Sequence, residues 1–193
     1  MNNVYFQADR SGYIKTLAAR PFILEIQMAN MKRSDARTAA FKLVAAAGYT
    51  DSDPSSLEEI YTDGLEMLEC PDDRYIRRVY FGVAENREKI DEYIENNSRG
   101  WKLARLAKVT LGILRVAAFE LIFCEDIPPS VAINEAVELA KSYDDEKAPA
   151  FINGILNSIA EACGAKARQS KSRKSGKPRA SSSDKDGKKG EVR

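Results

Sequence analysis

Three basic residues, Lys32, Arg33 and Arg37, lie close together at the start of the first strongly patterned segment of the chain. The dipole of a helix disfavours cations in its first turns, so this placement costs a small amount of stability. Guanidinium groups bind phosphate oxygens through paired hydrogen bonds, which makes a phosphate a suitable ligand for such a cluster. A solvated basic helix edge without a ligand explains the same pattern. Periodicity alone leaves both interpretations open.

A second group of polar and aromatic side chains lies in two consecutive blocks, Val131-Ala132-Ile133-Asn134-Glu135-Ala136-Val137-Glu138-Leu139-Ala140-Lys141 and Phe151-Ile152-Asn153-Gly154. The apolar members of the first block have helical spacing, and we expect Asn134 and Glu135 to satisfy neighbouring backbone ends. Phe151 is either part of the core or a platform on which an unpaired base stacks.

The residue types that are missing exclude several kinds of chemistry. The chain has no histidine, which removes Ser-His-Asp and Cys-His nucleophile systems and the usual zinc sites. Its glycines form neither a dinucleotide-binding motif nor a phosphate-binding loop, and its three cysteines include no CxxC pair. We therefore expect no enzyme activity, no catalytic residue, no metal and no cofactor.

The formal net charge of +1 conceals a strong asymmetry along the chain. Residues 1–164 carry a net charge of −7, and residues 165–193 carry +8. A basic segment of this kind indicates a polyanionic partner. Because residues 165–193 contain no aromatic residue and one branched aliphatic, they cannot bury enough apolar surface to fold, and we expect a disordered basic tail.

The elements that must position these residues are predicted to be helices throughout. Apolar residues recur at spacings of three, four or seven, and no alternating pattern competes with this signal. The predicted fold is therefore all-α, with two small helix bundles packed together. Helices are expected over residues 32–48, 57–68, 73–96, 101–123, 131–143 and 151 to about 164.

The chain divides into three parts, residues 1–31, a helical domain at 32–164 and the tail at 165–193. Residues 1–31 are either an N-terminal extension or the result of a mis-assigned start, with translation beginning at Met28 or Met31; the mass of the native N-terminus distinguishes these. No stretch resembles a secretory signal or a membrane span, so we expect a cytoplasmic protein.

The two blocks together resemble the NusB family of bacterial transcription antitermination factors. The similarity also includes Lys32-Arg33 with Ala36-Arg37, Ala40-Phe41 and Leu43, and Ile113-Leu114-Arg115 with Glu120-Leu121. It implies binding to the single-stranded boxA element of nascent transcripts such as ribosomal RNA leaders. It also implies assembly with NusE, a small-subunit ribosomal protein, on RNA polymerase.

The resemblance assigns roles to individual residues. It places RNA-binding residues at Lys32, Arg33, Arg37, Phe151 and Asn153, and NusE-binding residues at Leu106, Val109 and Thr110. On this assignment, an Arg37→Ala change is expected to weaken RNA binding and leave the melting temperature nearly unchanged.

Two residues depart from the family pattern, because relatives commonly carry an acidic residue at the position of Thr110 and an aromatic residue at that of Ala45. An alternative function is therefore a helical protein-interaction module with weak or lost specific RNA binding. We do not expect the methyltransferase domain that follows a NusB-like domain in certain ribosomal RNA methyltransferases, because only 29 residues of this sequence follow Gly164. The family includes monomers and dimers, so the resemblance implies either a monomer or a homodimer.

Overall fold

The structure, a computed structural model, describes residues 31–48, 56–98 and 100–165. Within these ranges the chain forms seven α-helices, one 3-10 turn and no strand, which confirms the all-α prediction. The elements are α2 (Arg33–Ala47), α3 (Leu57–Met67), α4 (Arg74–Glu85), α5 (Arg87–Asn97), the 3-10 turn η2 (Leu103–Arg105), α6 (Lys108–Phe123), α7 (Pro129–Tyr143) and α8 (Ala148–Ala162). The N-terminal segment up to residue 30 and the predicted disordered tail from residue 166 lie outside the described residues.

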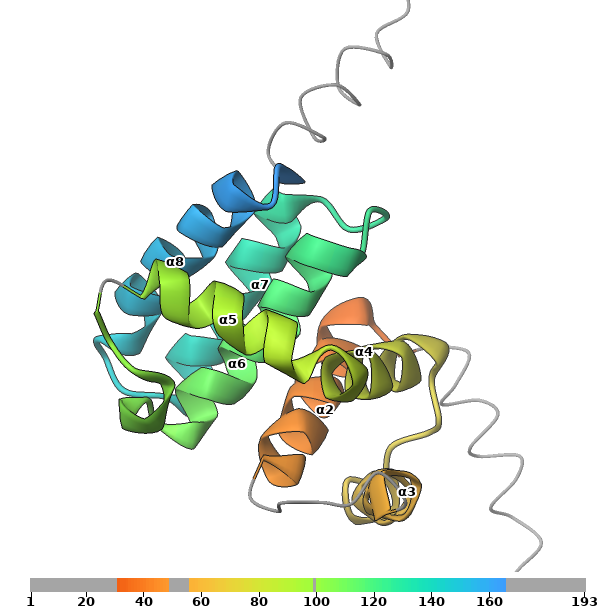
Figure 1. Cartoon of the computed structure of the whole chain (residues 1–193). Coiled ribbons are helices and arrows are strands. Elements are labelled where there is room, and N and C mark those ends of the chain that lie inside the picture. The colour runs from red at the N-terminus through yellow and green to blue at the C-terminus, as the bar shows by residue number, and fades with distance from the viewer. Residues whose placement is uncertain (1–30, 49–55, 99, 166–193) are drawn as a thin grey trace, which may run out of the picture.

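The helices form two groups that meet at α6 (Figure 1). Helices α2, α3 and α4 make the smaller N-terminal group, and α5 to α8 make the larger one. Helix α6 contacts α2 and α4 on one side and α5, α7 and α8 on the other. One continuous core of buried side chains joins the two groups.

Helix α6 is the central helix because almost its whole length is apolar. Eleven of its sixteen residues are buried, including Leu114, Val116 and Leu121. It begins at Lys108 and not near Trp101 as predicted, because η2 and an extended residue at Leu106 precede it. Across the described part of the chain, no helix is long and apolar enough to span a bilayer.

The predicted single helix over residues 73–96 is wrong, because two helices, α4 and α5, meet at Asn86. The backbone of Asn86 leaves the helical region, with φ −110° and ψ 19°. Its side-chain amide donates to the carbonyl oxygen of Gly82 at 2.8 Å, and its backbone N–H donates to the same oxygen. A side chain that binds the carbonyl four residues earlier competes with the helical pattern and helps to bend the chain there.

Candidate nucleic-acid interface

The N-cap and the first residue of α2, Lys32 and Arg33, present two cations to solvent. The apolar stripe of this helix, which includes Ala36, Ala40 and Phe41, is buried against the core, so Lys32 and Arg33 lie on the exposed side. The guanidinium carbon of Arg33 lies 4.6 Å from the centre of the Tyr75 ring of α4. This contact holds Arg33 between two helices while leaving it accessible.

Arg33 lines a groove of about 530 Å³, the α2 groove, between the start of α2, the start of α4 and the loop before α7. Two further exposed arginines, Arg74 and Arg78 of α4, line the same groove. Arg74 has no ion pair within the described residues. The apolar wall includes Val131, which is 42% exposed. The α2 groove therefore combines three accessible guanidinium groups with apolar contact surface.

One carboxylate of the α2 groove partly neutralises these cations. Asp126 accepts two hydrogen bonds from Arg78, at 2.9 and 3.0 Å. The Arg78 hydrogen bond lowers the pKa of the Asp126 carboxyl below its ordinary value, and the charge of Arg33 adds to the effect. Because both side chains are exposed, such a pair is worth only about 0.2–1 kcal/mol. A phosphate group can therefore replace Asp126 on Arg78 at small cost.

The structure places Arg37, one of the predicted RNA-binding residues, away from solvent. This arginine is 2% exposed, although it lies one turn after Arg33. Its Nε donates to both carboxylate oxygens of Glu120, and its two terminal nitrogens donate to Glu120 and Glu135 at 2.9 Å each. Arg37 also lines the α2 groove, but these hydrogen bonds occupy its guanidinium, so its main role is to hold the groove in place.

This buried ion cluster joins four helices, α2, α4, α6 and α7. Tyr75 donates its hydroxyl to Glu120 at 2.6 Å, and Glu120 itself is completely buried. Burial alone lowers the pKa of the Arg37 guanidinium, but the hydrogen bond and negative charge of Glu120 outweigh it, and the pKa is raised. Burial, reinforced by Glu120, raises the pKa of Tyr75. The cluster therefore keeps Arg37 charged and Tyr75 neutral at physiological pH.

Phe151 and Asn153 are not brought into the α2 groove. They lie near the start of α8, which follows the end of α7, whereas the groove reaches only the start of α7. Helix α7 has 15 residues and is therefore about 22 Å long. Phe151 is half-buried against Trp101, with ring centres 5.9 Å apart, and Asn153 is exposed. These two residues form a separate surface group, and Trp101, 52% exposed, extends it.

The predicted NusE-binding residues lie at the start of α6. Leu106 and Val109 are partly buried and pack against the core. Thr110 is 6% exposed and donates its hydroxyl to the Asp144 carboxylate at the end of α7, so little of its side chain is available to a partner. Ala45, the other departure from the family pattern, is half-buried where α2 approaches Gly112 of α6.

The cysteines provide no alternative chemical site. Burial raises the pKa of the Cys124 thiol to about 11, so it stays protonated at neutral pH and is a poor nucleophile. All three cysteines are free. Among the described residues, no three metal-binding side chains come together.

The sequence pattern missed four residues that shape this region, Arg74, Tyr75, Arg78 and Glu120. A signal for the arginines was present, because they lie opposite the apolar stripe of their helix, one turn apart. Glu120 interrupts an otherwise apolar segment, and a carboxylate buried in such a segment requires a cationic partner. The partner's identity depends on the tertiary fold.

Comparison with known proteins agrees with the family resemblance of the sequence. The sequence pattern of the NusB family matches residues 34–161. The transcription antitermination protein NusB of Natranaerobius thermophilus is 46% identical over 132 residues, which cover 67% of this chain and 95% of that protein. The solved structure of Thermotoga maritima NusB has 36% identity and a TM-score of 0.63, and the match covers 72% of this chain and 97% of that one. A structure of the antitermination factors NusB and NusE with double-stranded RNA contains a chain with 28% identity and a TM-score of 0.60, covering 67% and 96%.

Proposed function

Because this chain belongs to the NusB family, we propose that it is a transcription antitermination factor that binds boxA RNA of nascent ribosomal transcripts together with NusE on RNA polymerase. The relatives it resembles are named transcription antitermination proteins, and a related structure combines NusB, NusE and RNA. The observation in this chain that supports RNA binding best is the α2 groove with its three exposed arginines. The proposed action is binding, without catalytic turnover.

The charge distribution explains why RNA should bind locally. The part of the chain up to residue 164 has a net charge of −7, so it repels a polyanion at long range. The cations of the α2 groove, together with Lys32, provide the local attraction. Phosphate contacts by Arg33 and Arg74 fix the position of the strand, whereas base edges must supply the sequence preference.

The second surface group gives the strand a direction across the molecule. An RNA segment that contacts both Arg33 and Phe151 must follow the length of α7, about 22 Å. The partly exposed ring of Phe151 and the amide of Asn153 are suited to stacking on and hydrogen bonding to an unpaired base. NusE is proposed to dock beside Leu106 and Val109, at the start of α6.

A fluorescence titration of boxA RNA against a scrambled RNA, with and without NusE, tests the proposal. Replacing Lys32 and Arg33 together with alanine should weaken binding of both RNAs by about tenfold and lower the salt slope by about 1.4, the value for two lost phosphate contacts to a single strand. The matched control is Arg87→Ala, an exposed arginine of α5 that does not line the groove. It should leave both quantities unchanged.

Two results would contradict this proposal. Unchanged RNA affinity in the double variant would remove the start of α2 from the RNA site. Binding to NusE without any preference for boxA, in all settings, would favour the alternative of a protein-interaction module. The circular dichroism spectrum of each variant should match that of the parent, because Lys32 and Arg33 are exposed.

A further inference from the structure

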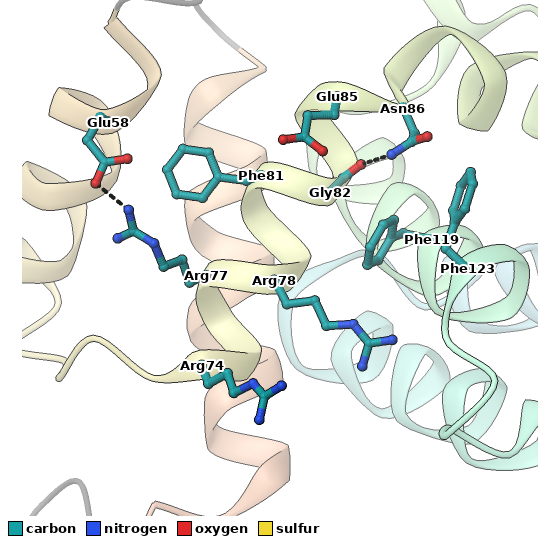
Figure 2. Close-up of a pocket in the computed structure, with 10 residues that line it drawn as sticks. All are labelled: Glu58, Arg74, Arg77, Arg78, Phe81, Gly82, Glu85, Asn86, Phe119 and Phe123. Atoms are coloured by element: carbon teal, nitrogen blue, oxygen red, sulfur yellow. Dashed lines mark hydrogen bonds and ion pairs between the residues drawn. The ribbon is translucent and has the colours of Figure 1, made fainter.

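A second groove, the α4 groove, runs over the exposed face of α4 between α3 and the C-terminal half of α6 (Figure 2). It has a volume of about 560 Å³ and shares Arg74 and Arg78 with the α2 groove. Arg77 lines the α4 groove but not the α2 groove. In Figure 2, Arg77 points towards α3, whereas Arg74 and Arg78 lie on the side of α4 nearer α6. The two grooves are therefore joined by a row of arginines.

We propose that the α4 groove binds the RNA segment that flanks the recognised element, through its phosphates and without reading its sequence. This inference rests on the proposed RNA-binding function. It adds a second part of the binding surface, on a different helix from the predicted basic residues.

The placement of the arginines on α4 supports an anionic ligand. All three lie in the first five residues of the helix, where the dipole disfavours positive charge, and the N-cap Asp73 is the acidic residue at that end, already occupied by backbone N–H groups. Arg74 and Arg78 are one turn apart, a like-charge spacing that destabilises a helix by about 0.2–0.5 kcal/mol. Arg78 pairs with Asp126, and Arg77 pairs with Glu58 and Asp72, but all of these pairs are exposed. Arg74, which has no such pair within the described residues, remains available to a phosphate.

The floor of the α4 groove explains why the contact should not read bases. Gly82 has no side chain, and a Cβ there would lie 2.2 Å from Cζ of Phe119, so the glycine lets that ring pack against α4. Arg77 lies over the ring of Phe81, and Lys89 lies over that of Phe123. Because cations already cover these rings, a base cannot readily stack on them. The ribose–phosphate backbone, in contrast, can contact the guanidinium groups and the apolar floor together.

Continuity between the grooves favours RNA over an acidic protein segment. A strand in the α2 groove that passes Arg74 enters the α4 groove without leaving the row of cations. One polyanion thus neutralises both sets of arginines. Glu58 and Glu85, which line the α4 groove, repel phosphates and peptide carboxylates alike, so the preference for RNA rests on a strand already bound in the α2 groove.

The test compares boxA RNA alone with boxA RNA extended by ten uridines at the 5′ or the 3′ end, using the full chain with NusE. At about 100 mM salt, one of the two extensions should raise the affinity of the parent protein by roughly three- to tenfold, since each added phosphate contact releases counterions. Arg77→Ala should abolish most of that gain and leave affinity for boxA alone unchanged. Arg33→Ala should weaken both RNAs by the same factor, and Arg87→Ala should change neither. An extension of ten adenosines should give the same gain as uridines.

Several outcomes would overturn the inference. If the parent protein binds boxA but neither extension adds affinity, the α4 groove does not bind RNA, although the proposed function stands. The same conclusion follows if Arg77→Ala weakens short and extended RNA equally. Binding of a poly-glutamate peptide that Arg77→Ala abolishes, without any gain from RNA extension, would assign the groove to an acidic protein partner. If no RNA binds with measurable preference, the proposed function fails as well, and the two failures are distinguishable.

Discussion

Arg33 and Arg37, one turn apart on α2, both lie near the Tyr75 ring of α4, but Arg33 is exposed and Arg37 is buried. Arg33 and Arg74 line the α2 groove with exposed guanidinium groups, whereas the guanidinium of Arg37, which also lines it, is held by carboxylates from α6 and α7. The Tyr75 ring lies 4.6 Å from the Arg33 guanidinium carbon and 5.5 Å from that of Arg37. Residues of one type, a single helical turn apart, thus have different roles because of where the carboxylates lie.

The difference shows what distinguishes a structural cation from a binding one. Arg37 meets Glu120, a residue 83 positions away in the sequence, and both lose contact with water. Such a pair is strongly coupled to folding, because removing one partner leaves a buried charge without compensation. Arg33 keeps its contact with solvent, so its removal should affect ligands more than the fold.

The largest effect that follows from this comparison is on stability. We expect Arg37→Ala to lower the free energy of unfolding by about 3–5 kcal/mol, because Glu120 would stay buried without its cationic partner. Urea denaturation followed by circular dichroism measures this change. The matched variant Arg33→Ala should change stability by less than about 0.5 kcal/mol. Equal stability of both variants would show that the buried cluster contributes nothing specific.

This prediction reverses the one made from the sequence, in which Arg37→Ala leaves the melting temperature nearly unchanged. Spacing placed Arg37 at the edge of the apolar stripe, and an edge position is compatible with either side of the helix. The carboxylates that draw Arg37 inside belong to helices far along the chain, and one sequence does not reveal their positions. The same limitation hid Arg74 and Arg78, which join Arg33 only after α2 and α4 have packed.

Most of the helices could be predicted because apolar periodicity reflects burial directly. The residues that define α6, such as Leu114 and Leu121, are buried as expected. The division of the 73–96 segment escaped prediction because Ile76, Val83 and Ile90 keep one helical spacing across Asn86. The apolar pattern contains no sign of the bend, which arises from the hydrogen bonds of Asn86 to Gly82.

An intermediate effect on stability should arise where α4 meets α6, at Gly82 and Phe119. Gly82→Ala places a methyl group in contact with the Phe119 ring, and overpacking of this kind costs about 1–3 kcal/mol. The control is Gly154→Ala in α8, where an added Cβ meets no atom within 4 Å. That change should stabilise the protein by about 0.5–1 kcal/mol, because alanine is the better helix former. Thermal unfolding of both variants measures the two opposite shifts, and a stabilised Gly82→Ala would contradict the close packing.

The smallest effect on stability concerns the exposed ion pair between Asp126 and Arg78. Asp126→Asn removes the carboxylate that holds Arg78, so stability should change by no more than about 1 kcal/mol, and RNA affinity should rise by roughly two- to fivefold. The pKa of Asp126 is lowered, so its pairing with Arg78 stabilises the fold above the ordinary aspartate range and is lost only as the pH falls through the lowered value. The affinity ratio of variant to parent should therefore stay constant between about pH 5 and 8 and shrink as salt is added. A titration series over pH and salt tests this, and a variant that binds RNA less tightly would mean that Asp126 orients Arg78 for the phosphate and does not compete with it.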